Sequence, residues 1–176
     1  MTNLLNRSAR QWCLVGSAFC VAMLAFALVL QYGFGLEPCP LCTFQRVAVL
    51  AALVPLVIGA LHNPRGWGGS VYGVLALIGA GTGIFLAGRH VWLQHLPADQ
   101  VPSCGPGLDY MMDVLPLKSV IATVLSSSGE CAEIEGSFLG ISLPGWTLLG
   151  FVVLALMMLG LIISAISRQR SNAHSR

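Results

Sequence analysis

Charged residues are scarce in this 176-residue chain. Only 9% of the residues are charged and 56% are hydrophobic, whereas an average soluble domain is roughly 25% charged. So few charges cannot coat a core against water, which excludes an ordinary soluble globule. The formal net charge is +2, too small and too scattered for a nucleic-acid-binding surface. The expected solvent is therefore lipid.

Motifs for protein-held redox cofactors are also missing. The sequence contains no GxGxxG dinucleotide fingerprint and no CxxCH haem attachment site. Paired histidines for a b-type haem are not evident in the apolar runs either. Any redox centre in this chain must therefore use its own cysteines and an acceptor that comes from outside the chain.

Four apolar runs are long enough to cross a membrane as helices, namely residues 12–30, 44–61, 71–88 and 146–166. As a helix, the first covers about 28 Å, close to the hydrocarbon thickness. The runs lack the alternation of a membrane barrel, and lipid leaves no partner for unpaired backbone groups. We therefore predict an all-α membrane protein with a four-transmembrane-helix bundle. A signal peptide is the alternative for the first run, but that run is long and no cleavage site follows it.

Charge is divided between the two sides of this bundle. Six of the nine basic residues lie in segments 1–11, 62–70 and 167–176, so these segments and both termini are expected in the cytoplasm. All seven acidic residues lie in the two outer loops, 31–43 and 89–145. We interpret residues 1–176 as a single membrane domain.

The second outer loop is longer than a connector needs to be, and such loops are usually functional. Apolar residues recur at helical spacing from Leu117 to Leu125, and Pro116 suits the first helical position. This pattern predicts a short amphipathic helix. It fits a helix in the membrane interface or one packed on the outer end of the bundle.

The six cysteines fall into two groups. Four are in the outer loops, namely Cys39, Cys42, Cys104 and Cys131. An oxidising outer compartment favours disulfides, and three pairings of four cysteines are possible. Cys13 and Cys20 lie on the first apolar run, where burial without a positive neighbour keeps thiols inert. We interpret these two as packing residues.

Residues 39–42 form a CxxC motif, Cys-Pro-Leu-Cys, which is typical of thiol redox catalysts. Cys42 is expected where the second helix begins, near free N–H groups and a partial positive charge that favour a thiolate. Arg46 follows on the same helical face, and a charged residue near lipid is a functional candidate. We predict that Arg46 stabilises a thiolate and polarises an electron acceptor. Arg46 as a snorkelling side chain, a zinc half-site and a purely structural disulfide are the alternatives.

A lipid-soluble electron acceptor fits this position, and quinone is the natural candidate. Four potential hydrogen-bond partners lie at the same boundary, namely Gln31, Gln45, Arg46 and His90. His90, at the outer end of the third run, is a candidate donor to a quinone carbonyl, although a solvated interfacial histidine is also consistent with its position.

Several segments together resemble a known family. They are the CxxC motif with Arg46, residues 89–94 (RHVWLQ), Cys104, residues 128–133 (SGECAE), and residues 138–140 (FLG) leading to residues 144–146 (PGW). In order and spacing the chain resembles the disulfide bond formation protein B (DsbB) family, the bacterial inner-membrane enzymes that reoxidise the periplasmic thiol oxidase DsbA. The relay from DsbA through DsbB to quinone is a known property of that family.

The resemblance implies roles for the outer cysteines. Reduced DsbA would attack a Cys104–Cys131 disulfide and form a mixed disulfide with Cys104. Electrons would pass through an interloop Cys39–Cys131 bond to the Cys39–Cys42 pair. The active site would face the periplasm.

For the membrane side of the site, the resemblance implies a Cys42 thiolate that interacts with ubiquinone or menaquinone. Arg46 would support that charge and His90 would lie near the quinone. No bound metal is expected. Gln45 departs from a relative that has an acidic residue there, and residues 103–107 are rich in glycine and proline. From other functional classes, a scaffold with two inert disulfides and a zinc-binding membrane module stay as alternatives.

Overall fold

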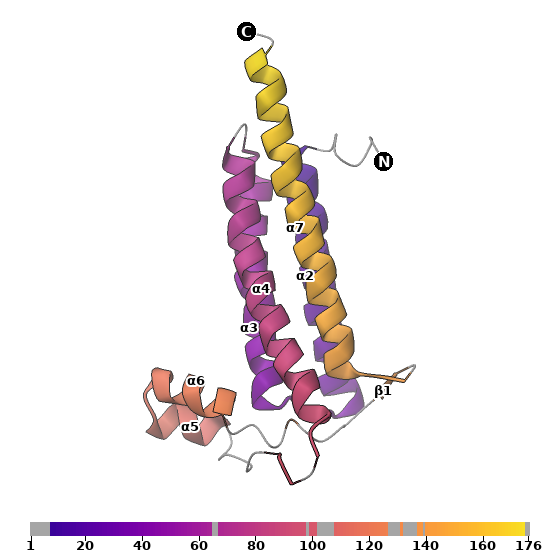
Figure 1. Cartoon of the computed structure of the whole chain (residues 1–176), viewed down its shortest axis with the longest axis vertical. Helices are drawn as coiled ribbons and strands as arrows, with labels where there is room; N and C mark the ends of the chain where they lie inside the picture. Colours follow the sequence, from indigo (N-terminus) through magenta and orange to yellow (C-terminus); the bar gives the residue numbers. More distant parts are fainter. Residues whose placement is uncertain are drawn as a thin grey trace.

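The structure, a computed structural model, describes residues 8–64, 67–97, 99–101, 108–126, 131, 137–138 and 140–174. Four long helices lie side by side in these residues (Figure 1), namely α2 (Ala9–Phe34), α3 (Pro40–His62), α4 (Gly68–Gln94) and α7 (Leu143–His174). All four are apolar and long enough to cross a membrane. The prediction of an all-α membrane protein built as a four-helix bundle is confirmed.

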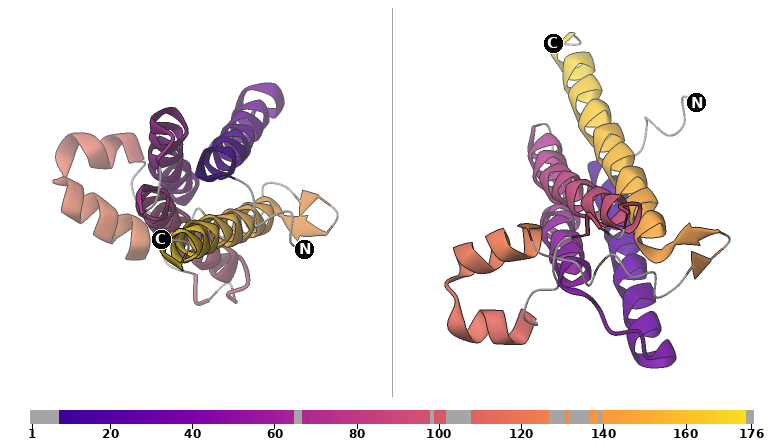
Figure 2. Two further views of the ribbon diagram at one scale, coloured as in Figure 1. Left: turned by 90° about the horizontal axis from the view of Figure 1, so that it is seen from above. Right: turned by 60° about the horizontal axis from the view of Figure 1, so that its bottom comes forward.

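The bundle buries one stripe of each long helix and leaves the rest of its apolar surface outside. Helix α4 packs between α3 and α7, and α2 packs against α3 and α7 (Figure 2). Phe151 and Leu154 are fully buried in the core, whereas Phe85 and Leu156 are 61% and 62% exposed. Leaving so much apolar surface in water costs about 25 cal/mol per Å². Lipid is the solvent that this outer surface fits.

Two glycines of α4 let its neighbours approach closely. A Cβ atom on Gly79 would lie 2.7 Å from the backbone nitrogen of Ala52 in α3, and one on Gly83 would overlap the ring of Phe151 in α7. Gly81, between them, has nothing within 4 Å of such an atom. These two glycines, four residues apart, therefore serve contacts inside the bundle.

The helices are longer than the predicted spans 12–30, 44–61, 71–88 and 146–166. Helix α2 begins with a capping box between Ser8 and Gln11, and it ends at Gly35, whose φ of 70° is left-handed. Helix α3 begins at Pro40, which suits the first helical position. An apolar run ends at the first polar residues, but a helix continues through them until a cap stops it. Cys42 and His90, assigned to the loops 31–43 and 89–145, are therefore helical.

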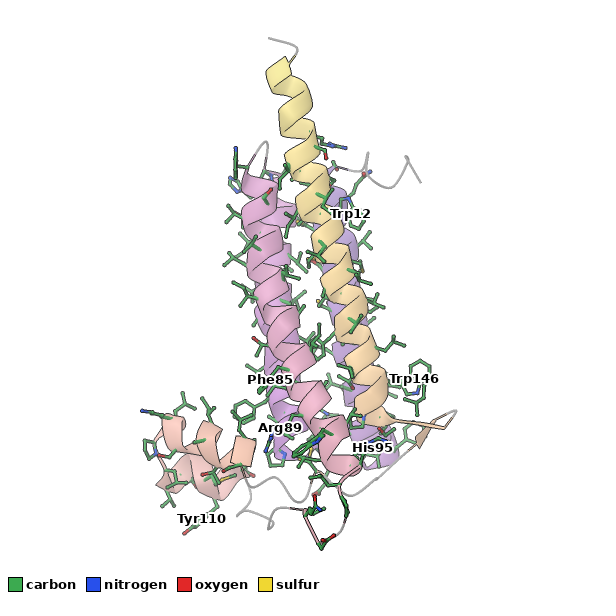
Figure 3. All side chains as sticks on the ribbon, in the orientation of Figure 1. Trp12, Phe85, Arg89, His95, Tyr110 and Trp146 are labelled. Carbon is green, nitrogen blue, oxygen red and sulfur yellow. The ribbon has the colours of Figure 1, made fainter. Side chains whose placement is uncertain are left out.

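The start of α2 and the end of α7 lie at the same end of the bundle (Figure 1). The connection from α2 to α3 lies at the opposite end, together with the end of α4. Trp12 lies near the first end and Trp146 near the second (Figure 3), as expected for tryptophans at the two membrane interfaces. We call the second end the site end.

Two short helices follow α4 and lie beside the site end (Figure 2), namely α5 (Leu108–Val114) and α6 (Leu117–Ser126). Helix α6 confirms the predicted amphipathic helix, and its Val120 and Val124 are buried. Leu117 and Ile121, on the same apolar face, are exposed. Its position in the membrane interface stays a prediction. Helix α5 was missed because seven residues are too few to show a periodic pattern.

A small hairpin precedes α7. Strands β1 (Ser137–Phe138) and β2 (Ile141–Ser142) pair antiparallel, with Ser137 opposite Ser142. Gly140, in the turn, has a φ of 79°, which glycine adopts without strain. Strands of two residues are too short for an alternating pattern, so the sequence did not predict them.

Candidate functional site

The CxxC motif forms the start of α3. Cys39 is the N-cap residue, and its sulfur accepts a hydrogen bond from the backbone N–H of Cys42 at 3.4 Å. The sulfurs of Cys39 and Cys42 are in hydrogen-bond contact at 3.2 Å, and both residues are free thiols in this structure. The helix begins two residues before Cys42, so its terminal N–H groups favour a charge on Cys39. The Cys39–Cys42 disulfide stays a prediction.

His90 reaches the sulfur pair from α4. Its imidazole is 3% exposed. Nε2 lies 3.9 Å from the Cys39 sulfur and Nδ1 lies 3.9 Å from the Cys42 sulfur. The amide nitrogen of Gln45, also buried, lies 3.3 Å from Nδ1. Gln45 is three residues after Cys42, on the same side of the helix, so the sequence spacing is the signal that places it beside the sulfurs.

Arg46 is held against α2. Its Nη1 donates to the side-chain oxygen of Gln31, and its Nη2 donates to the carbonyl oxygen of Ala27 at 3.2 Å. Because guanidinium is planar and permanently charged, two such bonds fix its orientation. The side chain therefore occupies a defined position between α2 and α3.

An apolar cavity of about 480 Å³ lies between α2, α3 and the start of α7. Cys42, Gln45 and Arg46 are among its few polar lining residues. Trp146, at the start of α7, is also part of the wall. His90 does not line it. Of the three residues predicted to lie near a quinone, Cys42 and Arg46 line the cavity. His90 contacts the two sulfurs instead.

Cys131 meets the sulfur pair from the long loop. It is 1% exposed. Hydrogen bonds with the thiols of Cys131 and Cys42 hold the pKa of Cys39, which precedes the membrane-spanning part of α3, well below its ordinary value. Burial opposes this shift, and His90 adds to it. Cys104, the fourth predicted site cysteine, lies outside the described residues.

The lowered pKa of Cys39 predicts unusual reactivity in the reduced protein. Alkylation of Cys39 by iodoacetamide should stay fast as the pH falls below the ordinary thiol pKa of about 8.5, because the thiolate is the reactive form. In Cys131→Ala the largest stabilising hydrogen bond is lost, so the pH midpoint should rise. Peptide mass spectrometry at each pH measures this midpoint.

Cys131→Ser is the matched variant, because its hydroxyl keeps a donor near Cys39. Its midpoint should lie between those of the wild type and Cys131→Ala. The same midpoint in all three proteins would show that Cys131 has no influence on the Cys39 thiol.

The arrangement permits a chain of thiol–disulfide exchanges. Cys131 contacts Cys39, Cys39 contacts Cys42, and Cys42 lies in the wall of the cavity. Exchange needs a thiolate in contact with another sulfur and access for both partners. These sulfurs form a continuous path from a loop outside the bundle to an apolar space between its helices.

Comparisons with known proteins agree with this geometry. The family model for Disulfide bond formation protein DsbB matches residues 9–161. A Disulfide bond formation protein B of Chromohalobacter salexigens is 56% identical over 168 residues, which cover 95% of this chain and 98% of that protein. The namesake of Nitrosococcus oceani is 51% identical over 145 residues, or 82% and 86% of the two chains. The chain therefore belongs to the DsbB family of disulfide bond formation proteins.

Proposed function

We propose that this protein reoxidises a periplasmic DsbA-like thiol oxidase and passes the electrons to membrane ubiquinone or menaquinone. The observation that carries the proposal is the position of the CxxC pair. Cys39 contacts Cys131 of the long loop, while Cys42 lies in the wall of an apolar cavity. The pair therefore has a protein sulfur on one side and a space for an apolar acceptor on the other.

The first exchanges take place in the long loop. A thiolate of reduced DsbA attacks Cys104 of the Cys104–Cys131 disulfide, forms a mixed disulfide and releases the Cys131 thiolate. The second DsbA thiol then attacks the mixed disulfide. This step releases oxidised DsbA and the Cys104 thiol. Each step exchanges one sulfur–sulfur bond for another.

The following exchanges carry the electrons to α3. The Cys131 thiolate attacks Cys39 of the Cys39–Cys42 disulfide, forms a Cys39–Cys131 bond and releases the Cys42 thiolate. Attack of Cys104 on Cys131 restores the loop disulfide and frees Cys39. The contact between Cys131 and Cys39 supports this route, because the attack needs no large movement of either residue.

The cavity fits a quinone. Its wall is mainly apolar, and its volume of about 480 Å³ is within the usual range for small-molecule sites. A bound quinone supplies an acceptor for two electrons and two protons. Cys42 supplies the electron-rich sulfur at the wall, and the fixed Arg46 guanidinium stabilises negative charge there. The buried Gln45 side chain orients the His90 imidazole beside the two sulfurs.

The proposed setting is the bacterial inner membrane, with both termini in the cytoplasm and the site end at the periplasm. Arg10 and Arg168 belong to the first and last parts of the bundle, which share the end opposite the site (Figure 1). The positive-inside rule assigns that end to the cytoplasm.

Trapping the thiols tests the function. Membranes with and without quinone are treated with reduced DsbA, the thiols are alkylated, and the mass shift of each cysteine peptide is read. Reduced Cys39 and Cys42 should accumulate only when quinone is absent. Insensitivity to quinone, with both pairs oxidised, would instead support an inert disulfide scaffold. Unbridged outer cysteines with retained metal, whether or not quinone is present, would support a zinc-binding module. Either result overturns the proposed function.

A further inference from the structure

We propose that the reduced site binds a thiophilic divalent ion, Zn²⁺, through Cys39, Cys42 and His90, and that the bound ion blocks reoxidation of the sulfur pair. The ligand atoms of these three residues all lie within 4.8 Å of one another. The inference goes beyond the proposed function, because binding depends only on the reduced chain and the ion.

The distances are close to those of a zinc site. With Zn–S bonds of about 2.3 Å and a tetrahedral angle, two ligating sulfurs lie about 3.8 Å apart, and a sulfur and an imidazole nitrogen lie about 3.6 Å apart. The sulfurs here are 3.2 Å apart, and His90 Nε2 is 3.9 Å from the Cys39 sulfur. Side-chain shifts of about half an ångström complete the geometry. Cys39 is the N-cap residue of the helix whose first turn carries Cys42.

Gln45 is placed to support His90 as a ligand. When Nε2 binds the metal, Nδ1 carries the proton and needs an acceptor. The Gln45 amide lies 3.3 Å from Nδ1, and rotation of this amide presents its oxygen to the N–H group. Gln45 is then a positioning residue, because it orients the imidazole and touches no metal.

The charges and surroundings also suit a zinc ion. Two cysteines that lose their protons on binding neutralise the two charges of the metal, which favours a neutral site at a membrane boundary. A water molecule is the candidate for the fourth ligand, because a third thiolate would give the site a net negative charge. Cys39 and Cys42 are only partly buried, so an ion can reach them.

This site exists in one redox state. When Cys39 and Cys42 form a disulfide, neither sulfur is a thiolate, and only His90 is left. Zinc therefore competes with the oxidation of the pair, and a chelator should restore turnover. The ion would hold reduced enzyme out of the cycle without any electron transfer of its own.

Zinc binding to the purified full-length protein is the direct test. Thiol-reduced and diamide-oxidised samples are titrated with ZnCl₂ against a chromogenic chelator, with neither DsbA nor quinone present. We expect about one tightly bound ion per reduced chain and none per oxidised chain. Equal binding by the two redox states of this same protein would overturn the proposal. Co²⁺ in place of Zn²⁺ should give thiolate-to-metal absorption in the reduced sample only.

Variants identify the ligands. His90→Ala should weaken zinc binding by more than about tenfold, since even changes to groups around a ligand cost 10- to 100-fold. Gln45→Leu should weaken zinc binding less than His90→Ala does. Gln45→Glu should bind zinc at least as tightly as the wild type. His95→Ala removes an exposed histidine at the end of the same helix and should leave the affinity unchanged. Equal affinity of His90→Ala and His95→Ala would remove His90 from the site and overturn the assignment.

Discussion

Replacement of Cys42 by serine should reduce quinone reduction to the background rate measured without protein. Serine matches the size of cysteine but is no two-electron thiol donor, so the cavity wall loses the only thiol that lines it among the described residues. The measurement is the loss of quinone absorbance with purified variant and reduced DsbA. The mixed disulfide between DsbA and Cys104 should still form, because that exchange takes place in the long loop.

Cys20→Ala is the matched control, because it also removes a cysteine from a long helix. Cys20 is fully buried in α2 and does not line the cavity. Its variant should reduce quinone at the wild-type rate. Normal quinone reduction by Cys42→Ser would contradict the assignment of Cys42 as the residue that delivers electrons, however intact the other cysteines are.

The bundle could be predicted from sequence because lipid allows few alternatives. Long apolar runs predict helices, because lipid leaves no partner for unpaired backbone groups. Helix ends were less predictable, because they depend on caps. The start of α3 at Pro40 moved the helix N-terminus from Cys42 to Cys39 and so changed which sulfur it stabilises.

The cluster around the sulfurs shows the limit of local patterns. The spacing of Cys42, Gln45 and Arg46 along one helix was visible in the sequence. His90 contacts the sulfurs from α4 and does not line the cavity. This position depends on how α3 and α4 pack against each other. No periodicity gives that relation between residues 48 positions apart. The cavity is formed by three helices, so the sequence could not predict that Trp146 is part of its wall.

Replacement of Arg46 by alanine should raise the apparent KM for quinone about 10- to 100-fold. Hydrogen bonds to charged groups contribute about 1.5–3 kcal/mol, and each 1.4 kcal/mol is a factor of ten in affinity. The guanidinium lines the cavity and is held by Gln31 and by the carbonyl oxygen of Ala27. Its loss therefore removes a fixed positive charge from the acceptor's side of Cys42. Initial rates over a range of quinone concentrations measure the change.

Two further variants separate charge from orientation at this position. Arg46→Lys keeps the charge but lacks the planar fork that holds two partners, so its KM should lie between those of the wild type and Arg46→Ala. Gln31→Ala keeps the guanidinium and removes one anchor, and its KM should rise less than that of Arg46→Ala. If all three variants insert normally and share the wild-type KM, Arg46 only links α2 to α3 and takes no part in quinone binding. A graded series instead assigns the effect to a positive charge held in one orientation at the cavity wall.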